Sequence, residues 1–325
     1  MTIRPLLLIL AAVPTLAAAQ ARPYIEVGSA NFRPLPIAVS TFRADAGAEA
    51  PAAEMTEVLR GDLRLSGLFD VLDPRGFLAE PGEGLSAPTI RFARWVDVGA
   101  DGLVKALVRR SGGELVGEFH LFEVRAGREV LSQTLRGGPG ATRALAHQFA
   151  DAVVQYYTHE PGIFRTRILA LRRAGAGGRE IVAYDVDGQR AEVLFRDSGL
   201  ILLPTWRPDG RAVLFTSYRG GRPELWTLDV ATRRAQRLLA VGDLTTGGVY
   251  SPDGRHIAFT ASVNGNSDVW VANADGSQPR RLTSDPAIDG SPTWSPDGKR
   301  LCFVSSRSGN PHLYLMNADG SGQRR

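Results

Sequence analysis

The second half of the chain alternates between short apolar runs and clusters of glycine, proline and aspartate, starting near residue 164. Runs such as RAVLFTS (211–217) and ELWTLD (224–229) have the length and the β-branched and aromatic content of strands. Some of the runs alternate and others are apolar throughout, as expected when a sheet packs on a neighbouring sheet. The pattern predicts an all-β region.

The strand pattern repeats every 44 residues. The strings TWRPDGRA, VYSPDGRH and TWSPDGKR begin at positions 205, 249 and 293, respectively. The same spacing relates Phe215 to the phenylalanines at 259 and 303, and Trp226 to the aromatic residues at 270 and 314. A repeat of roughly 40–45 residues that holds several short strands is typical of a β-propeller blade.

Each repeat divides into four predicted strands. In the last copy, strand one ends at Trp294, KRLCFVSS (299–306) is strand two and HLYLMN (312–317) is strand three. In the preceding copy, QPRRLTS (278–284) is strand four. The Ser-Pro-Asp-Gly turn after strand one suits a tight reversal, because proline fixes φ, aspartate bonds to following amides and glycine adopts the left-handed conformation. The repeated aspartates therefore indicate turns rather than calcium ligands or catalytic acids.

An incomplete copy precedes the first full repeat. RTRILALRR (165–173) and EIVAYDVDG (180–188) match strands two and three, but Gly162 stands where the aromatic residue of strand one is expected. We therefore expect a first blade without its own inner strand, and a propeller ring can be closed by a strand from the far end of a chain. Arg324 and Arg325 match residues within strand four. We expect about four blades, in a chain that lacks further blades and the closing strand.

Residues 20–160 show no such repeat and predict a separate α/β domain, followed by the propeller at 161–325. Helices are expected over 52–69, where Met55, Leu59 and Leu63 share a face with Asp62, and over 141–157. Strands are expected at 34–42 and in the runs GLVKALVRR, LVGEFHLFEV and REVLSQTL. Residues 1–19 carry Arg4, an apolar run and small residues up to Ala19, as an export signal cleaved near Ala19 would.

The composition of the chain argues against nucleic-acid binding and against a metal or cofactor site. The formal net charge is +4, but the arginines are scattered among acidic residues and form no basic stripe, which argues against nucleic-acid binding. Cys302 is the only cysteine, so no intramolecular disulfide can form, and its apolar strand predicts a small buried thiol. The five histidines show no metal-ligand spacing, so we expect neither a metal nor a cofactor.

The order of these elements, with the junction GIFRTRI (162–168) and the WSPDG-type turns, resembles the TolB family of periplasmic propeller proteins. The resemblance implies a six-bladed propeller whose last inner strand comes from the C-terminus. It also implies a monomeric, non-enzymatic scaffold of the Tol–Pal system. Such a scaffold binds the peptidoglycan-associated lipoprotein Pal, which makes it peripheral to the outer membrane, and binds TolA. It supports outer-membrane integrity and constriction during cell division.

The same resemblance suggests the contact residues. Pal would contact the loops between blades, at Leu244, Thr245, Thr246, Gly247, Asp289 and Gly290. Leu244 departs from the family here, since a histidine stands at this position in the best-known member. TolA would bind the segment from Gln20 to about Arg33, at Arg22, Tyr24 and Ile25.

Two alternatives belong to other classes. A serine peptidase gated by a propeller needs a Gly-x-Ser-x-Gly turn, and the sequence has none. A propeller that binds a small ligand in its channel stays open as a second alternative.

Overall fold

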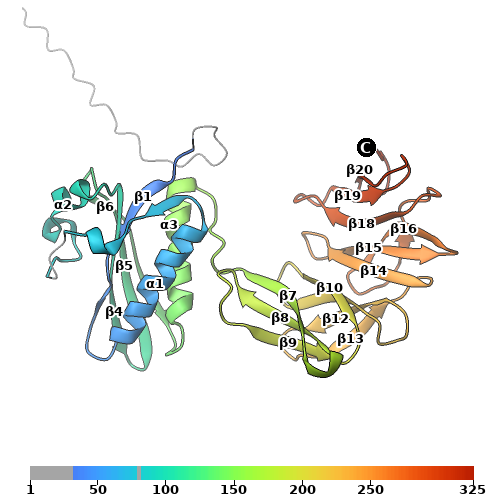
Figure 1. Ribbon diagram of the computed structural model, residues 1–325, viewed down its shortest axis with the longest axis horizontal. Coiled ribbons are helices and arrows are strands. Elements are labelled where there is room, and N and C mark those ends of the chain that lie inside the picture. The colour runs from blue at the N-terminus through green and yellow to red at the C-terminus, as the bar shows by residue number, and fades with distance from the viewer. Residues whose placement is uncertain (1–31, 79–81) are drawn as a thin grey trace, which may run out of the picture. The chain divides into compact units, whose positions relative to one another are not determined.

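The computed structural model describes residues 32–78 and 82–325, in two compact units, Met1–Gly162 and Ile163–Arg325 (Figure 1). The predicted export signal and the predicted TolA-contacting residues Arg22, Tyr24 and Ile25 lie outside the described residues. The predicted fold class, an α/β domain followed by propeller sheets, is confirmed. No helix within the described ranges combines the length and the apolar character needed to span a membrane.

The first unit is built on one sheet with the order β3-β1-β4-β5-β6, and β1 runs parallel to both β3 and β4. The short strand β2 also pairs with β4. The strands are β1 (Leu35–Val39), β2 (Arg43–Ala44), β3 (Phe69–Val71), β4 (Gly102–Ser111), β5 (Glu114–Glu123) and β6 (Arg128–Gly137). The helices are α1 (Glu49–Leu65), α2 (Phe92–Asp97) and α3 (Thr142–Thr158).

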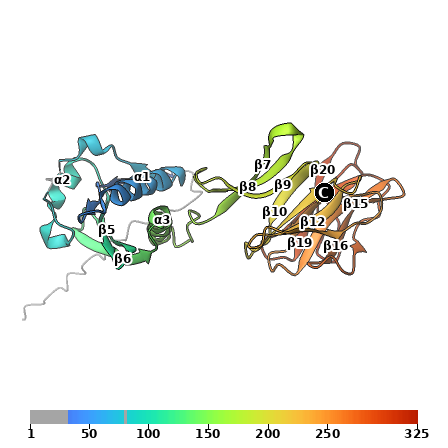
Figure 2. The same ribbon diagram turned by 90° about the horizontal axis from the view of Figure 1, so that it is seen from below.

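Helices α1 and α3 pack on each other and on one face of this sheet, as Figures 1 and 2 show. Helix α1 begins three residues earlier than predicted, since Pro51 is tolerated in the first turn, and it ends before Gly67, whose φ of 67° stops a helix. The predicted apolar face of α1 is buried. Asp62 within that face is also buried, and its Oδ2 lies 2.7 Å from Nδ1 of His147 on α3.

The opposite face of the sheet is covered by the segment that contains α2, whose Trp95 packs on Leu103 and Phe122. A buried ion pair lies beside it. Nζ of Lys105 is 2.7 Å from Oε2 of Glu83, and the two side chains are only 6% and 4% exposed. Burial alone would raise the pKa of Glu83, but hydrogen bonds from Lys105 and from the backbone N–H of Arg91 outweigh it and lower that pKa.

The second unit consists of four successive antiparallel sheets, with the orders β7-β8-β9, β10-β11-β12-β13, β14-β15-β16-β17 and β18-β19-β20. The first two sheets contain β7 (Arg167–Arg173), β8 (Arg179–Asp185), β9 (Glu192–Asp197), β10 (Ile201–Trp206), β11 (Ala212–Ser217), β12 (Glu224–Asp229) and β13 (Ala235–Leu239). The last two contain β14 (Leu244–Tyr250), β15 (His256–Val263), β16 (Asn266–Asn273), β17 (Arg280–Arg281), β18 (Asp289–Trp294), β19 (Arg300–Ser305) and β20 (His312–Asn317). Each sheet packs on the next, and within residues 163–325 the four sheets do not close into a ring (Figure 1).

The first sheet has three strands and no inner strand, as the sequence predicts. The predicted match of Arg324 to strand four is also confirmed, because this residue pairs with Leu315. Strand four of the third sheet is shorter than predicted and covers only Arg280–Arg281. Just beyond it, the side chain of Thr283 accepts the N–H of Val269, so a side chain replaces the regular backbone ladder.

The Ser-Pro-Asp-Gly turns have the predicted chemistry. Gly210, Gly254 and Gly298 are left-handed, with φ of 70–71°. Oδ1 of the aspartate in each turn accepts the backbone N–H two residues further on, at 3.0 Å in all three copies. The repeated aspartates hold turns, as the sequence analysis concludes.

Apolar residues at equivalent positions pack each sheet onto the next one. Leu225 and Val269 are fully buried among residues of the following sheet. Their counterpart in the last sheet, Leu313, is 67% exposed, and Leu315 is 37% exposed. The prediction that Cys302 is buried is wrong for the same reason, since this thiol lies on the same partly exposed face of β19, which no other sheet covers among the residues that the structure describes.

The two lysines of the chain differ in burial, which gives a stability test of the first unit. We expect Lys105→Met to lower the free energy of unfolding by about 3–5 kcal/mol, because it leaves the carboxylate of Glu83 buried without its cation. Lys299→Met removes the same group from an exposed turn and should change stability by less than about 0.5 kcal/mol. Urea unfolding followed by the total tryptophan fluorescence, to which Trp95 of the first unit and Trp294 of the second both contribute, measures the two variants. Equal effects would contradict a structural role for the buried pair.

Candidate functional site

The inner strands of three sheets share a bulge near their first residues. The register with the second strand shifts after Leu202 in β10, after Thr246 in β14 and after Gly290 in β18. The next residue is left-handed in every copy, with φ of 52° at Leu203, 65° at Gly247 and 52° at Ser291. Glycine adopts this conformation freely, whereas for leucine it costs about 1–3 kcal/mol.

The six predicted Pal-contacting residues lie at these bulged strand starts. The prediction that these residues lie in loops between blades is wrong. Leu244 pairs with Ser262 and Asp289 pairs with Ser305, so the inner strands begin before the bulge. The backbone hydrogen bonds that define the strand are thus already formed at the predicted contact positions.

Two of the six side chains are buried and serve the propeller interior. Thr245 is 1% exposed, and its hydroxyl accepts the N–H of Val241 and donates to the carbonyl of the same residue. Asp289 is 0% exposed, and its Oδ2 accepts Nη2 of Arg307 at 2.6 Å. Neither side chain is placed to touch a partner.

The other four predicted residues, Leu244, Thr246, Gly247 and Gly290, are partly exposed. Two apolar residues that were not predicted as contacts stand at the same position as Leu244 in neighbouring repeats. Leu200 is 40% exposed and Ile288 is 66% exposed. The 44-residue period alone would have found them.

A third missed residue extends this surface. The strained Leu203 is 53% exposed, and a Cβ built on Gly247 would lie 3.8 Å from its Cδ1, so Leu203 reaches the next inner strand. We name the surface formed by Leu200, Leu203, Leu244 and Ile288 the apolar rim. Apolar side chains that gather on a surface and are exposed or partly exposed are a typical feature of a protein-binding surface.

Two arginines hold the loops that lie beside the starts of the inner strands. Arg219 pairs with Asp197 at 2.7 Å and lies over the ring of Trp226. Arg307, at the same repeat position, pairs with Asp289 and lies over Tyr314. The loop after β11 is thus fixed to the last residue of β9, and the loop after β19 is fixed to the first residue of β18, which holds that strand start in place.

Two protein-family models match this chain. A family model described as the TolB beta propeller domain matches residues 154–325, and one described as the TolB amino-terminal domain matches residues 23–130. The chain belongs to the TolB family. The predicted resemblance is therefore confirmed.

Relatives named Tol-Pal system protein TolB resemble this TolB family member over two thirds of its length. The protein of Anaeromyxobacter dehalogenans strain 2CP-C is 61% identical over 219 residues, which cover 67% of this chain and 50% of that protein. The protein of Myxococcus xanthus strain DK1622 is 44% identical over the same shares. The chain spans about half the length of these curated relatives.

A solved structure supports the fold independently. The crystal structure of TolB from Acinetobacter baumannii has a TM-score of 0.78 and 24% sequence identity, and the match covers 93% of this chain and 73% of that one. At this identity, the likeness shows that the two proteins share a fold.

Arg307 contacts two carboxylates, which gives a test of the buried one. We expect Asp289→Ala to destabilise the propeller unit by about 3–5 kcal/mol, because it leaves the guanidinium of Arg307, which is only 18% exposed, without its buried partner. Asp285 lies further away, at 3.8 Å, and is 33% exposed, so Asp285→Ala should cost about 1 kcal/mol. Thermal unfolding of both variants measures the difference, and an equal loss would show that burial does not set the strength of these pairs.

Proposed function

We propose that this chain is a non-enzymatic periplasmic scaffold of the Tol–Pal system whose propeller docks the lipoprotein Pal on the apolar rim. The single observation that carries the proposal is the recurrence of an apolar side chain that solvent reaches at one position of three successive repeats, exposed at Leu200 and Ile288 and partly exposed at Leu244. Family membership supports the choice of partner, because relatives at up to 61% identity are named as Tol–Pal components.

The proposed docking surface combines apolar contact with exposed polar groups. Beside the apolar rim, Thr246 is partly exposed, and its hydroxyl lies 3.1 Å from that of Thr216. A surface with apolar anchors and a polar surround is the usual composition of a specific protein interface. Thr245 and Asp289 support this surface from inside, so we assign them a positioning role.

The proposal extends to the second partner. We assign TolA binding to the segment from Gln20 to about Arg33, including Arg22, Tyr24 and Ile25, on the strength of the family resemblance. Export to the periplasm, attachment to the outer membrane through Pal and a part in cell division belong to the same proposal. We propose that the protein acts as a monomer and without a metal or cofactor.

The apolar rim provides the test of Pal docking. We expect Leu244→Ser and Ile288→Ser each to weaken Pal binding about tenfold or more, because burying such a side chain contributes about 1.5–3 kcal/mol. Isothermal titration calorimetry with purified Pal measures the dissociation constants.

Ile168→Ser is the matched control, because Ile168 is 49% exposed on β7 and lies outside the apolar rim. This variant should bind Pal as the unaltered protein does. Unchanged affinity in both rim variants would contradict docking at this surface.

A deletion separates the two proposed partners. Removing residues 20–31 should abolish TolA binding and leave the Pal dissociation constant within about twofold, because the propeller sheets lie in a separate compact unit. Pull-down with TolA and calorimetry with Pal measure the two effects. Retained TolA binding would contradict the assignment of the N-terminal segment.

A further inference from the structure

On the side of the Ser-Pro-Asp-Gly turns, an arginine packs on an aromatic ring at one interface between neighbouring propeller sheets. Between the second and third sheets, the guanidinium of Arg207 lies over the ring of Tyr250, 6.0 Å from its centroid. Nε of Arg207 is 3.5 Å from Asp209 and would lie 3.6 Å from a Cβ built on Gly254. The arginine of one turn therefore covers the aromatic residue of the next sheet.

The next interface repeats this arrangement without the arginine. Ser251 takes the place of Arg207, and Trp294 takes the place of Tyr250. The serine hydroxyl is turned into its own loop, where it donates to Oδ1 of Asp253 at 2.5 Å and accepts the N–H of His256 at 3.0 Å. Among the residues that the structure describes, no cation lies over the ring of Trp294.

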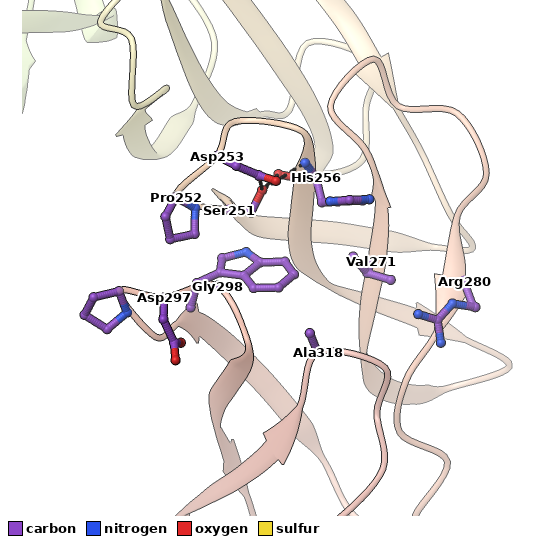
Figure 3. Close-up of a pocket in the computed structure, with 11 residues that line it drawn as sticks. Ser251, Pro252, Asp253, His256, Val271, Arg280, Asp297, Gly298 and Ala318 are labelled. Carbon is purple, nitrogen blue, oxygen red and sulfur yellow. Dashed lines mark hydrogen bonds between the residues drawn. The ribbon is translucent and has the colours of Figure 1, made fainter.

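A cavity of about 550 Å³ lies at this interface (Figure 3). Its lining includes Ser251 and Trp294, the counterparts of Arg207 and Tyr250 in the preceding interface. Trp294, Val271 and Ala318 supply apolar lining. The labelled side chains of Asp253 and Asp297 belong to the two turns that flank it (Figure 3). The volume falls within the usual range for sites that bind small molecules or single side chains.

The electrostatics of the cavity favour a cation. Hydrogen bonds from Ser251 and from the N–H of Arg255 lower the pKa of Asp253. Hydrogen bonds from Ser295 and from the N–H of Lys299 do the same for Asp297. Both carboxylates are therefore ionised at neutral pH, beside an indole face that attracts cations.

Two side chains that can carry a positive charge, Arg280 and His256, also line the cavity. Arg280 is exposed, and its Nη1 already donates to the carbonyl of Asp319 at 2.9 Å. His256 is exposed at the edge of the cavity. Two ionised carboxylates and one engaged arginine leave the lining with a net negative charge.

We propose that this cavity between the third and fourth sheets binds an arginine side chain of a partner polypeptide. The guanidinium would stack on Trp294 and pair with Asp253 or Asp297, as Arg207 stacks on Tyr250 and approaches Asp209 within the chain itself. Guanidinium suits such a site because it stacks on aromatic rings and bonds to carboxylates at once. The site lies at the turns, away from the apolar rim, and does not depend on the proposed binding of Pal.

The test uses Nα-acetyl-argininamide, with the neutral citrulline analogue as a matched control and N-acetyl-glutamate as an anionic probe. Titration of the full chain is followed by the indole N–H signals of its tryptophans in heteronuclear NMR. We expect the arginine probe to shift the Trp294 signal saturably and citrulline to bind at least fivefold more weakly. Equal binding of arginine and citrulline, or preferential binding of glutamate, would overturn the proposal.

Two exchanges within the repeat provide the variants. Ser251→Arg places the arginine of one turn in the other and should abolish binding of the probe at Trp294. Arg207→Ser creates a Ser-Pro-Asp-Gly turn in the second sheet and should open a second site over Tyr250, detected as a saturable shift of the Tyr250 backbone amide signal. Both variants carry turn sequences that this chain already folds.

A third variant tests the proposal even if Ser251→Arg or Arg207→Ser disturbs folding. Asp297→Asn leaves the cavity and its indole in place and removes one charge, so the probe should bind about fivefold more weakly. Full affinity for the arginine probe in both Asp297→Asn and Ser251→Arg would show that binding occurs elsewhere.

Discussion

Each of the first three propeller sheets buries an apolar face against the sheet that follows it, and the position of every other feature in this unit depends on that packing. Leu214 and Leu225 pack among residues of the third sheet, and Ala258 and Val269 among residues of the fourth. Because the contacts recur at fixed positions of the repeat, each sheet meets the next in the same way. The starts of the inner strands and the turns at their ends are therefore presented on opposite sides, at regular intervals.

Regular packing makes departures from the repeat informative. Phe215, Phe259 and the phenylalanine at 303 are constant and buried, and they maintain the fold. Other positions vary under the same geometry. Arg207 covers an aromatic ring between the second and third sheets, whereas Ser251 at the equivalent position leaves a cavity between the third and fourth sheets, and the backbone of the turn stays the same.

Much of the propeller could be predicted from the sequence because its signals are local and periodic. The left-handed glycines of the turns, the aromatic spacing and the missing inner strand before Gly162 follow from single residues read at a fixed interval. The bulges were not predicted, because a leucine at 203 carries no local sign of a left-handed backbone. Resemblance gave the positions of Thr245 and Asp289 but not the direction of their side chains, which the long-range partners determine.

The first unit shows the same limit, since its decisive contacts join residues that are distant in the sequence. Asp62 belongs to an apolar helix face by period, yet its partner His147 lies on another helix. Lys105 pairs with Glu83, which lies 22 residues away in the sequence, so no local sequence pattern predicts the pair.

Hydrogen–deuterium exchange of the chain with and without Pal tests the proposed docking surface most directly. Slower exchange on adding Pal is predicted at the amides of residues 200–203, 244–247 and 288–291, where the bulged inner strands begin. Protection confined to the turns at 207–210, 251–254 and 295–298 would place the partner on the opposite side and contradict the assignment.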